Sequence, residues 1–200
     1  MAASLGAAFF RTRPELETPD VQFHVQPFSK DNLVDSTHDF SAFTASACQL
    51  RLESTARLAL KSEHANDYPA IHPNYLSTTM DCETLVAGIR IARRIGACEP
   101  LKSIVTGEHA PGSDVGDAHD EILAWARSSA TTIFHPTGTC KMGSDTMAVV
   151  DQRLTVHGVP GLRVADCSVM PRIVSGNTNA AAIMIGEKAS AMILEDVSRG

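Results

Sequence analysis

The sequence predicts an α+β fold, on the strength of three patterns in its apolar residues. Residues 21–27 alternate apolar and polar side chains, and a similar alternation recurs between residues 48 and 60, which is the period of a half-buried strand. Apolar residues at helical spacing occupy 77–96, 117–127 and 179–195. Hydrophobic residues make up 44% of the 200-residue chain, which is enough to bury one core or two small ones.

The first expected strand ends at Pro27, because proline removes a donor from the hydrogen-bonded ladder. Residues 1–20 form an apolar start followed by a polar loop, and residues 28–45 show no period and are expected to be loop. Segments 48–52 and 58–60 carry leucines of one parity, so they are predicted to pair as antiparallel strands around a short turn.

The first helix is expected to begin at a capping residue within 77–79 and to end near Gly96. Prolines make the preceding segment, 67–76, an extended connection. A second helix is expected to open at Asp114 or Asp117, since aspartate caps the free N–H groups of a helix start.

Beyond residue 130 the pattern changes to short apolar runs separated by turns. A β-prone run at 131–134 is followed by expected strands at 148–150, 154–156 and 162–165. The last helix, 179–195, carries an apolar side made of Ile183, Ile185, Ala189, Met192 and Ile193.

Composition excludes several classes of protein. The formal net charge is −6 and no basic run interleaves with aromatics, so a nucleic-acid surface is not expected. Apolar runs are far shorter than the roughly 20 residues that a bilayer span needs, and a cytoplasmic setting is expected. The five cysteines contain no CxxC pair and are read as reduced thiols. No metal site is expected, because His135 and Cys140 have no further ligand at usable spacing.

Residues that can do chemistry concentrate between Ile133 and Ala189. His135 stands between a β-prone run and Pro136, so its ring is presented on a stiff backbone and can take a proton near neutral pH. Taken alone, a histidine at a strand end is more often a structural hydrogen-bonding residue, and an asparagine before a helix is more often an N-cap, which is the alternative for Asn177. The group around Asp166 and Cys167 also has a structural interpretation, as a corner where side chains bond to local amides.

Several spaced motifs that occur in one order favour the catalytic interpretation of these residues over the structural one. They are His-Pro-x-Gly-Thr-x-x-Met-Gly at 135–143, Val-Val-Asp-x-x-Leu-x-Val-x-Gly-Val-x-Gly-Leu-Arg-Val-x-Asp at 149–166, Ser-Val-Met-Pro at 168–171 and Gly-Asn-Thr-Asn-Ala at 176–180. Together they resemble the C-terminal signature of glucose-methanol-choline (GMC) oxidoreductases, most closely the choline-dehydrogenase-like branch.

The resemblance implies an FAD-dependent enzyme that oxidises a CH–OH group of a small alcohol to an aldehyde or ketone by hydride transfer to flavin N5. His135 would be the proton acceptor and Asn177 would bond the substrate oxygen. Asp166, Cys167, Thr178, Asn179 and Ala180 would contact the cofactor.

The resemblance also implies the domain organisation. Residues 1–130 would form part of the substrate-binding domain, with helices on one face of an antiparallel sheet. Residues 131–200 would carry the active-site His and Asn, with strands and a helix that complete the FAD-binding domain. The electron acceptor, oxygen or a quinone, stays open.

The family's Gly-x-Gly-x-x-Gly turn, which binds the adenosine diphosphate of FAD, has no counterpart in this sequence. The chain is therefore expected to correspond to a C-terminal half, completed by a missing N-terminal half or by a separate flavin-binding chain. The alternative is an inactive or non-enzymatic binding module that keeps the fold without the chemistry.

Overall fold

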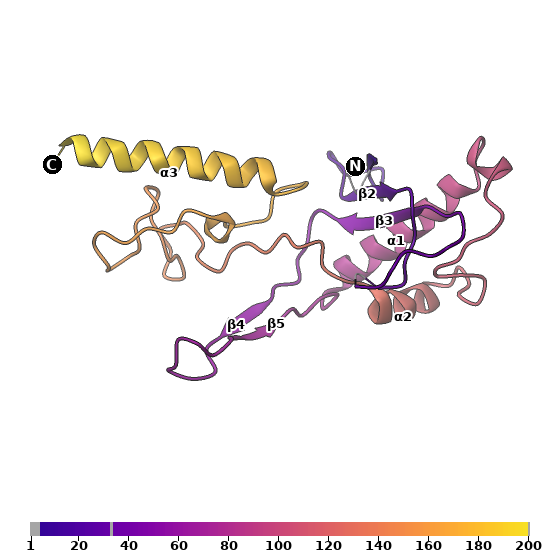
Figure 1. Cartoon of the computed structure of the whole chain (residues 1–200), viewed down its shortest axis with the longest axis horizontal. Coiled ribbons are helices and arrows are strands. Elements are labelled where there is room, and N and C mark those ends of the chain that lie inside the picture. The colour runs from indigo at the N-terminus through magenta and orange to yellow at the C-terminus, as the bar shows by residue number, and fades with distance from the viewer. Residues whose placement is uncertain (1–4, 33, 200) are drawn as a thin grey trace. The chain divides into compact units, whose positions relative to one another are not determined.

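The computed structural model describes residues 5–32 and 34–199, and it divides into two compact units that meet in sequence at Thr131 and Thr132. Figure 1 identifies the elements of both units. The first unit contains β1 (Gly6–Phe10), β2 (Val21–Gln26), β3 (Thr44–Gln49), β4 (Arg57–Ala59), β5 (Ala70–His72), α1 (Thr79–Gly96), the short 3-10 helix η1 (Leu101–Ser103) and α2 (His119–Ser129). The second contains the 3-10 helix η2 (Cys167–Val169) and α3 (Asn179–Arg199).

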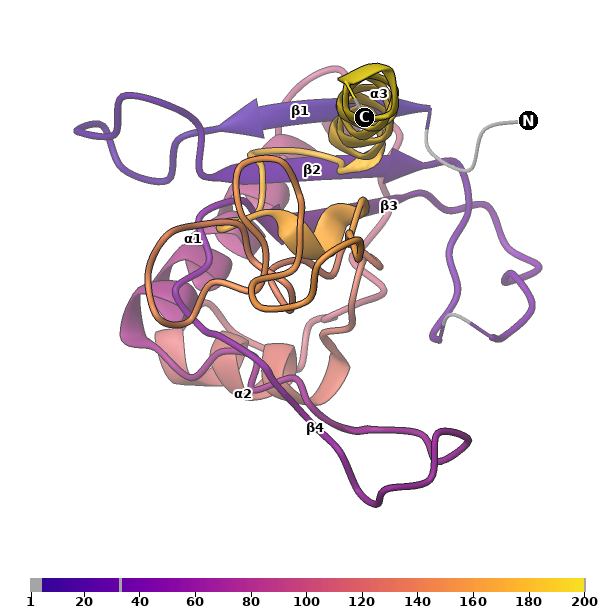
Figure 2. The same ribbon diagram turned by 90° about the vertical axis from the view of Figure 1, so that its left-hand side faces the viewer.

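A three-stranded antiparallel sheet in the order β1-β2-β3 is the base of the first unit (Figure 2). Its central strand buries Val21 and Phe23 against Ile91 of α1, which covers one face of the sheet. Gly88 allows this close approach, because a Cβ there would lie 3.3 Å from the Cβ of Ala47 on β3. The α+β class and its antiparallel sheet are therefore confirmed.

The predicted strand pairing in this unit is wrong. β3 ends at Gln49, begins within the segment expected to be loop, and pairs with β2 from Thr44–Gln26 to Gln49–Val21. β4 pairs instead with β5, inside the segment expected to be an extended connection. Burial explains the error, since Leu50 is buried but Leu60 is 88% exposed, so their shared parity marks no common face.

Strand β1 was not predicted at all. Its sequence Gly-Ala-Ala-Phe-Phe shows no apolar alternation, because β1 is an edge strand with little buried surface. Ala8 and Phe10 pack against the core, and the ring of Phe10 meets the ring of Phe23 edge-on, with centroids 5.5 Å apart.

A buried carboxylate organises the chain between the two sheets. Asp81, in the first turn of α1, is fully buried and accepts hydrogen bonds from Gln49 Nε2 (2.8 Å), Glu53 N (3.0 Å) and Ser54 N (2.8 Å). These bonds use the backbone donors that a hairpin turn between 48–52 and 58–60 would have needed. The chain after β3 is thus fixed to the start of α1 rather than to β4.

The helices of the first unit follow the sequence signals closely. Thr78 caps α1 by accepting from the N–H of Asp81, and the helix ends at Gly96 as expected. The predicted aspartate caps of α2 are wrong: its N-cap is Ala118, which makes no side-chain bond. Asp117 pairs instead with Arg90 of α1, at 3.4 Å between Nε and Oδ1. Ile122 and Ala126 of α2 are buried against Val86 and Ile89 of α1.

The second unit is held by a core between α3 and irregular loops. The expected strands at 131–134, 148–150, 154–156 and 162–165 are not formed as strands; among residues 132–199 only isolated β-bridges occur, such as Val150–Val156 and Thr155–Arg163. Positive φ angles at Leu154, Gly158 and Gly161 interrupt the extended backbone. The buried core residues are Val150, Leu154, Val169, Met170, Ile185 and Ala189.

Helix α3 runs four residues past its expected end at 195, as far as Arg199. Its expected apolar side is only partly buried: Ile185 and Ala189 are in the core, whereas Ile183 is 60% exposed. Arg153 and Arg163 reach its last turns, where both pair with Asp196. In the described residues, no helix combines the length and the apolar character that a bilayer crossing requires.

Asp81→Asn is expected to lower the free energy of unfolding by about 2 kcal/mol, because one carboxylate oxygen becomes an NH2 group facing backbone donors. Urea unfolding followed by circular dichroism measures the change. Asp120→Asn is the matched control, since the Asp120 side chain is fully exposed and its substitution should change stability little.

The Asp81→Asn variant also tests how the stability contributed by Asp81 depends on pH. Burial raises the pKa of Asp81, but hydrogen bonds from Glu53, Ser54 and Gln49 outweigh it and hold the pKa below the ordinary carboxyl value. Its stabilisation is therefore complete above the unfolded-state pKa, about 4, and is lost as the pH falls through the lower folded-state pKa. The stability difference between wild type and Asp81→Asn should shrink over that range; a constant difference would contradict this account.

Candidate active site

Both ring nitrogens of His135 are hydrogen-bonded by consecutive residues at the start of α3. Nδ2 of Asn177 lies 3.0 Å from His135 Nε2, and Oγ1 of Thr178 lies 3.1 Å from His135 Nδ1. The structure thus brings together the two residues that the sequence marks as catalytic, although they are far apart along the chain.

The orientation of the Asn177 amide favours one tautomer of the ring. An amide NH2 group only donates, so Nε2 of His135 accepts from Asn177 and carries a lone pair. In the neutral ring the proton then resides on Nδ1 and is donated to the hydroxyl oxygen of Thr178. The imidazole presents an acceptor nitrogen on its Asn177 side.

The backbone before His135 is strained. Phe134 has a φ of 62°, a left-handed conformation that a bulky residue rarely adopts. The run at 131–134 is therefore a turn into the site rather than the predicted strand end. Gly138 follows with a φ of 87°, which explains the glycine in the His-Pro-x-Gly motif.

Two backbone hydrogen bonds place this segment beside η2. The N–H of Cys140 donates to the carbonyl of Ser168 (3.0 Å) and the N–H of Met142 to that of Val169 (2.8 Å). Because Val169 is buried in the core under α3, the His135 segment and the start of α3 are held by the same packing.

A hollow of about 440 Å³ opens next to His135. That volume lies within the range of small-molecule sites. Its lining is mainly apolar with a few polar groups: Phe134, Pro136, Thr139, Ala165, Asp166, Cys167, Ser168, Thr178 and Ala182.

Asp166 has a local partner. Its carboxylate caps η2 by accepting from the N–H of Ser168 at 2.7 Å. Hydrogen bonds from Ser168, first its hydroxyl and then its backbone N–H, hold the pKa of Asp166 below the ordinary carboxyl value. The side chain is therefore a negatively charged acceptor at the edge of the hollow, suited to hydroxyl groups rather than to phosphate.

The remaining predicted cofactor residues divide into two groups. Cys167 and Thr178 line the hollow with Asp166, whereas Asn179 and Ala180 do not. Asn179 and Ala180 instead form the first turn of α3, whose leading N–H groups have no acceptor within the helix. They offer backbone donors and the positive end of the helix dipole.

The sequence interpretation missed the second contact to His135. Thr178 was expected only to approach a cofactor, yet its hydroxyl bonds the histidine ring and its side chain is buried. Its position next to Asn177 was the one available signal. Phe134, Pro136 and Thr139 were not expected to line a site, because nothing in their spacing shows that they face η2.

Comparison with known proteins gives the family of the chain. Residues 53–186 match the sequence profile of the family described as GMC oxidoreductase, which is more than half of the chain. The chain belongs to the GMC oxidoreductase family. The resemblance read from the spaced motifs is thereby confirmed, and members of this family depend on FAD.

Two curated relatives match this chain over most of its length. The chain is 42% identical over 190 residues to an alcohol dehydrogenase [acceptor] of Pseudomonas putida, covering 94% of this chain and 34% of the relative. It is 42% identical over 187 residues to the mitochondrial choline dehydrogenase of Mus musculus, covering 92% and 31% respectively. The chain thus spans about one third of the length of these curated relatives.

Solved structures share the fold. A formate oxidase of Aspergillus oryzae, whose FAD modification was under study, superposes with a TM-score of 0.82 at 26% identity, over 90% of this chain and 32% of its own. Pyridoxine 4-oxidase of Mesorbium loti gives a TM-score of 0.85 at 24% identity, over 94% and 37%, which supports the fold alone.

The residues of this chain fit one end of FAD. An ionised carboxylate, a buried hydroxyl and mainly apolar side chains line the hollow, a set of groups suited to a flavin ring and its polyol. These 200 residues contain no Gly-x-Gly-x-x-Gly turn of the kind that binds the phosphates of FAD.

Thr178→Val is expected to abolish the preference of His135 for the Nδ1–H tautomer, because it removes the acceptor of that proton. Nitrogen chemical shifts of the imidazole, measured above its titration range, report the tautomer directly. Thr139→Val is the control, since Thr139 lines the hollow without contacting the ring. A dominant Nε2–H tautomer in the unaltered chain would contradict the assignment.

Proposed function

We propose that this chain supplies the proton-accepting and substrate-orienting residues of an FAD-dependent enzyme that oxidises a small alcohol to an aldehyde or ketone. The observation that carries the proposal is the pairing of His135 Nε2 with the Asn177 amide at 3.0 Å. FAD, when bound, supplies the hydride acceptor at its N5 atom.

The roles of the two side chains follow from their hydrogen bonds. A substrate hydroxyl that inserts at Nε2 of His135 meets a lone pair and gives up its proton there. Asn177 then donates its NH2 group to the substrate oxygen, which stabilises charge on that atom. The bond from Nδ1 to Thr178 keeps the imidazole in the orientation that exposes Nε2.

The substrate class is supported by the hollow and by the relatives. A largely apolar lining of about 440 Å³ suits a small organic molecule. The similar proteins include an alcohol dehydrogenase and choline dehydrogenases. We place the protein in the cytoplasm, a setting supported by five cysteines that are all free thiols.

The purified chain alone is expected to retain no stoichiometric FAD after gel filtration, because the turn that grips the adenosine diphosphate must come from other residues of the protein or from a separate chain. Absorbance of the eluted protein in the flavin band measures this. An equimolar flavin band would show that these 200 residues hold FAD unaided and would overturn the requirement.

The catalytic roles are tested in an intact enzyme. We would replace the matching third of the Pseudomonas putida alcohol dehydrogenase with this chain and measure alcohol-dependent turnover with an artificial electron acceptor. His135→Ala should reduce turnover by about 10²-fold or more, with flavin content unchanged. Asn177→Ala should also reduce turnover, since the substrate oxygen loses its donor.

His157→Ala is the matched control, because His157 is an exposed histidine of the same unit whose Nε2 lies 3.1 Å from the Gly143 carbonyl. Its turnover should equal that of the unaltered chimera. Full turnover in His135→Ala would refute the proposed role of that residue. A flavin-loaded chimera without any turnover would favour the alternative, a binding module that keeps the fold without the chemistry.

A further inference from the structure

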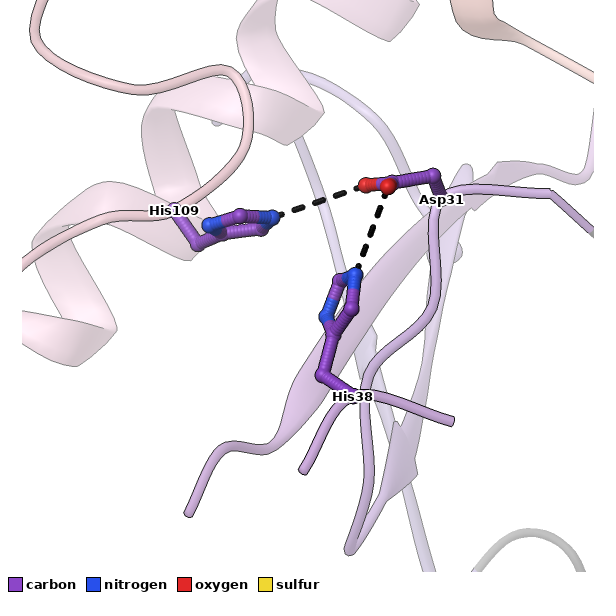
Figure 3. Close-up of side chains that lie close together, drawn as sticks. All are labelled: Asp31, His38 and His109. Carbon is purple, nitrogen blue, oxygen red and sulfur yellow. Dashed lines mark ion pairs between the residues drawn. The ribbon is translucent and has the colours of Figure 1, made fainter. Parts of the chain in front are cut away.

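Two loops of the first unit bring an aspartate and two histidines together. Asp31 and His38 lie in the loop between β2 and β3, and His109 lies in the loop between η1 and α2. One carboxylate oxygen and one nitrogen of each ring all lie within 4.8 Å of one another. Figure 3 shows both imidazoles turned toward the same carboxylate.

The spacing of these atoms resembles that of metal ligands. Nε2 of His38 is 3.3 Å from Oδ2 of Asp31, and Nε2 of His109 is 3.5 Å from Oδ1. Two nitrogen or oxygen ligands of a tetrahedral ion, each about 2.1 Å from it, are about 3.4 Å apart. Each imidazole nitrogen lies at about that separation from one carboxylate oxygen, Oδ2 for His38 and Oδ1 for His109, so a small shift of the carboxylate and the rings lets all three side chains bind one ion.

Residues outside the cluster also hold the two imidazole rings in place. Nδ1 of His38, the nitrogen that faces away from Asp31, is bonded to Oγ of Ser29 at 2.8 Å. Such an outer bond fixes which nitrogen of a metal-binding histidine is available. The ring of Phe40 stacks on His38, with centroids 4.7 Å apart, and lies against His109 at 5.2 Å.

The loop that carries His109 is anchored too. Its neighbour Glu108 pairs with Arg93 of α1, with Nε 3.0 Å from Oε1. Burial is graded across the cluster, from 18% side-chain exposure at His38 to 67% at Asp31. Solvent therefore has access to the carboxylate side, where water can complete the coordination of an ion.

We propose that Asp31, His38 and His109 form a binding site for a divalent transition-metal ion of the zinc type. Two imidazoles and one carboxylate match the ligands of zinc and disfavour magnesium and calcium, which prefer oxygen. The bound ion joins the loop after β2 to the loop before α2 and stabilises the first unit. The site contains none of the residues of the proposed alcohol oxidation, so either proposal can fail without the other.

The test uses the full chain, stripped with a chelator and dialysed against micromolar ZnCl₂. We expect one equivalent of zinc by elemental analysis and a rise of several degrees in the melting midpoint of the first unit. Equimolar MgCl₂ should cause no rise. Titration with Co²⁺ should give visible absorption bands without the intense near-ultraviolet band of cobalt–thiolate bonds, which separates this site from the cysteines.

Asp31→Asn keeps the shape of the side chain and removes its charge, and His109→Ala truncates a half-exposed residue; each should weaken zinc binding by at least about tenfold. His119→Ala is the matched control, because His119 is exposed and sits beside a carboxylate, with Nδ1 3.0 Å from Oδ1 of Asp120. It should bind zinc normally. Circular dichroism of each variant checks its folding.

Three results would overturn the proposal. They are the absence of retained zinc in the unaltered chain, unchanged zinc affinity in folded Asp31→Asn and His109→Ala, and a cobalt–thiolate band. In any of these cases the three side chains form a hydrogen-bonded cluster only.

Discussion

The imidazole of His135 is held at both nitrogens by neighbouring residues of one short segment, and the chemistry of the second unit depends on that constraint. A histidine bonded at one nitrogen only could rotate or exchange tautomers, and its acceptor atom would have no fixed direction. Asn177 and Thr178 remove both freedoms. Their own positions are set by the core beneath α3, where Val169 and Ile185 pack together, so the reactive geometry is a product of packing as well as of hydrogen bonding.

In the first unit, the buried carboxylate of Asp81 is the polar group on which the local structure depends. Asp81 joins the last residue of β3, two backbone amides after it and the first turn of α1. These bonds satisfy a carboxylate that would otherwise be buried without partners, which is why a charged residue can occupy a fully buried site. The carboxylate thereby determines where the sheet ends and where the chain departs toward β4.

Residue patterns were reliable where one side of an element is buried and misleading elsewhere. The alternation of β2 and the period of α1 reflect a real core, and both elements were predicted with nearly correct ends. β1 is an edge strand, and the leucines near residues 50–60 do not share a face, so periodicity carried no information there. In the second unit, apolar runs around Val150 and Val156 form isolated bridges rather than strands, and Leu154 between them has a positive φ. The pairing of His135 with Asn177 could be predicted from the sequence, because the motifs that contain them are distinctive in order and spacing. The hydroxyl of Thr178 and the approach of His109 to Asp31 arise from the fold alone.

The adjacency of Asn177 and Thr178 limits how this protein can change in length. Asn177 and Thr178 directly precede α3 and both bond the imidazole, so one residue inserted between Thr178 and the first turn of α3 would displace both side chains from the helix that positions them. Substitutions elsewhere in the loops can be absorbed one side chain at a time. Insertions and deletions here cannot, and the segment joining Ser175 to Asn179 is therefore under a constraint of length that its largely exposed surface does not reveal.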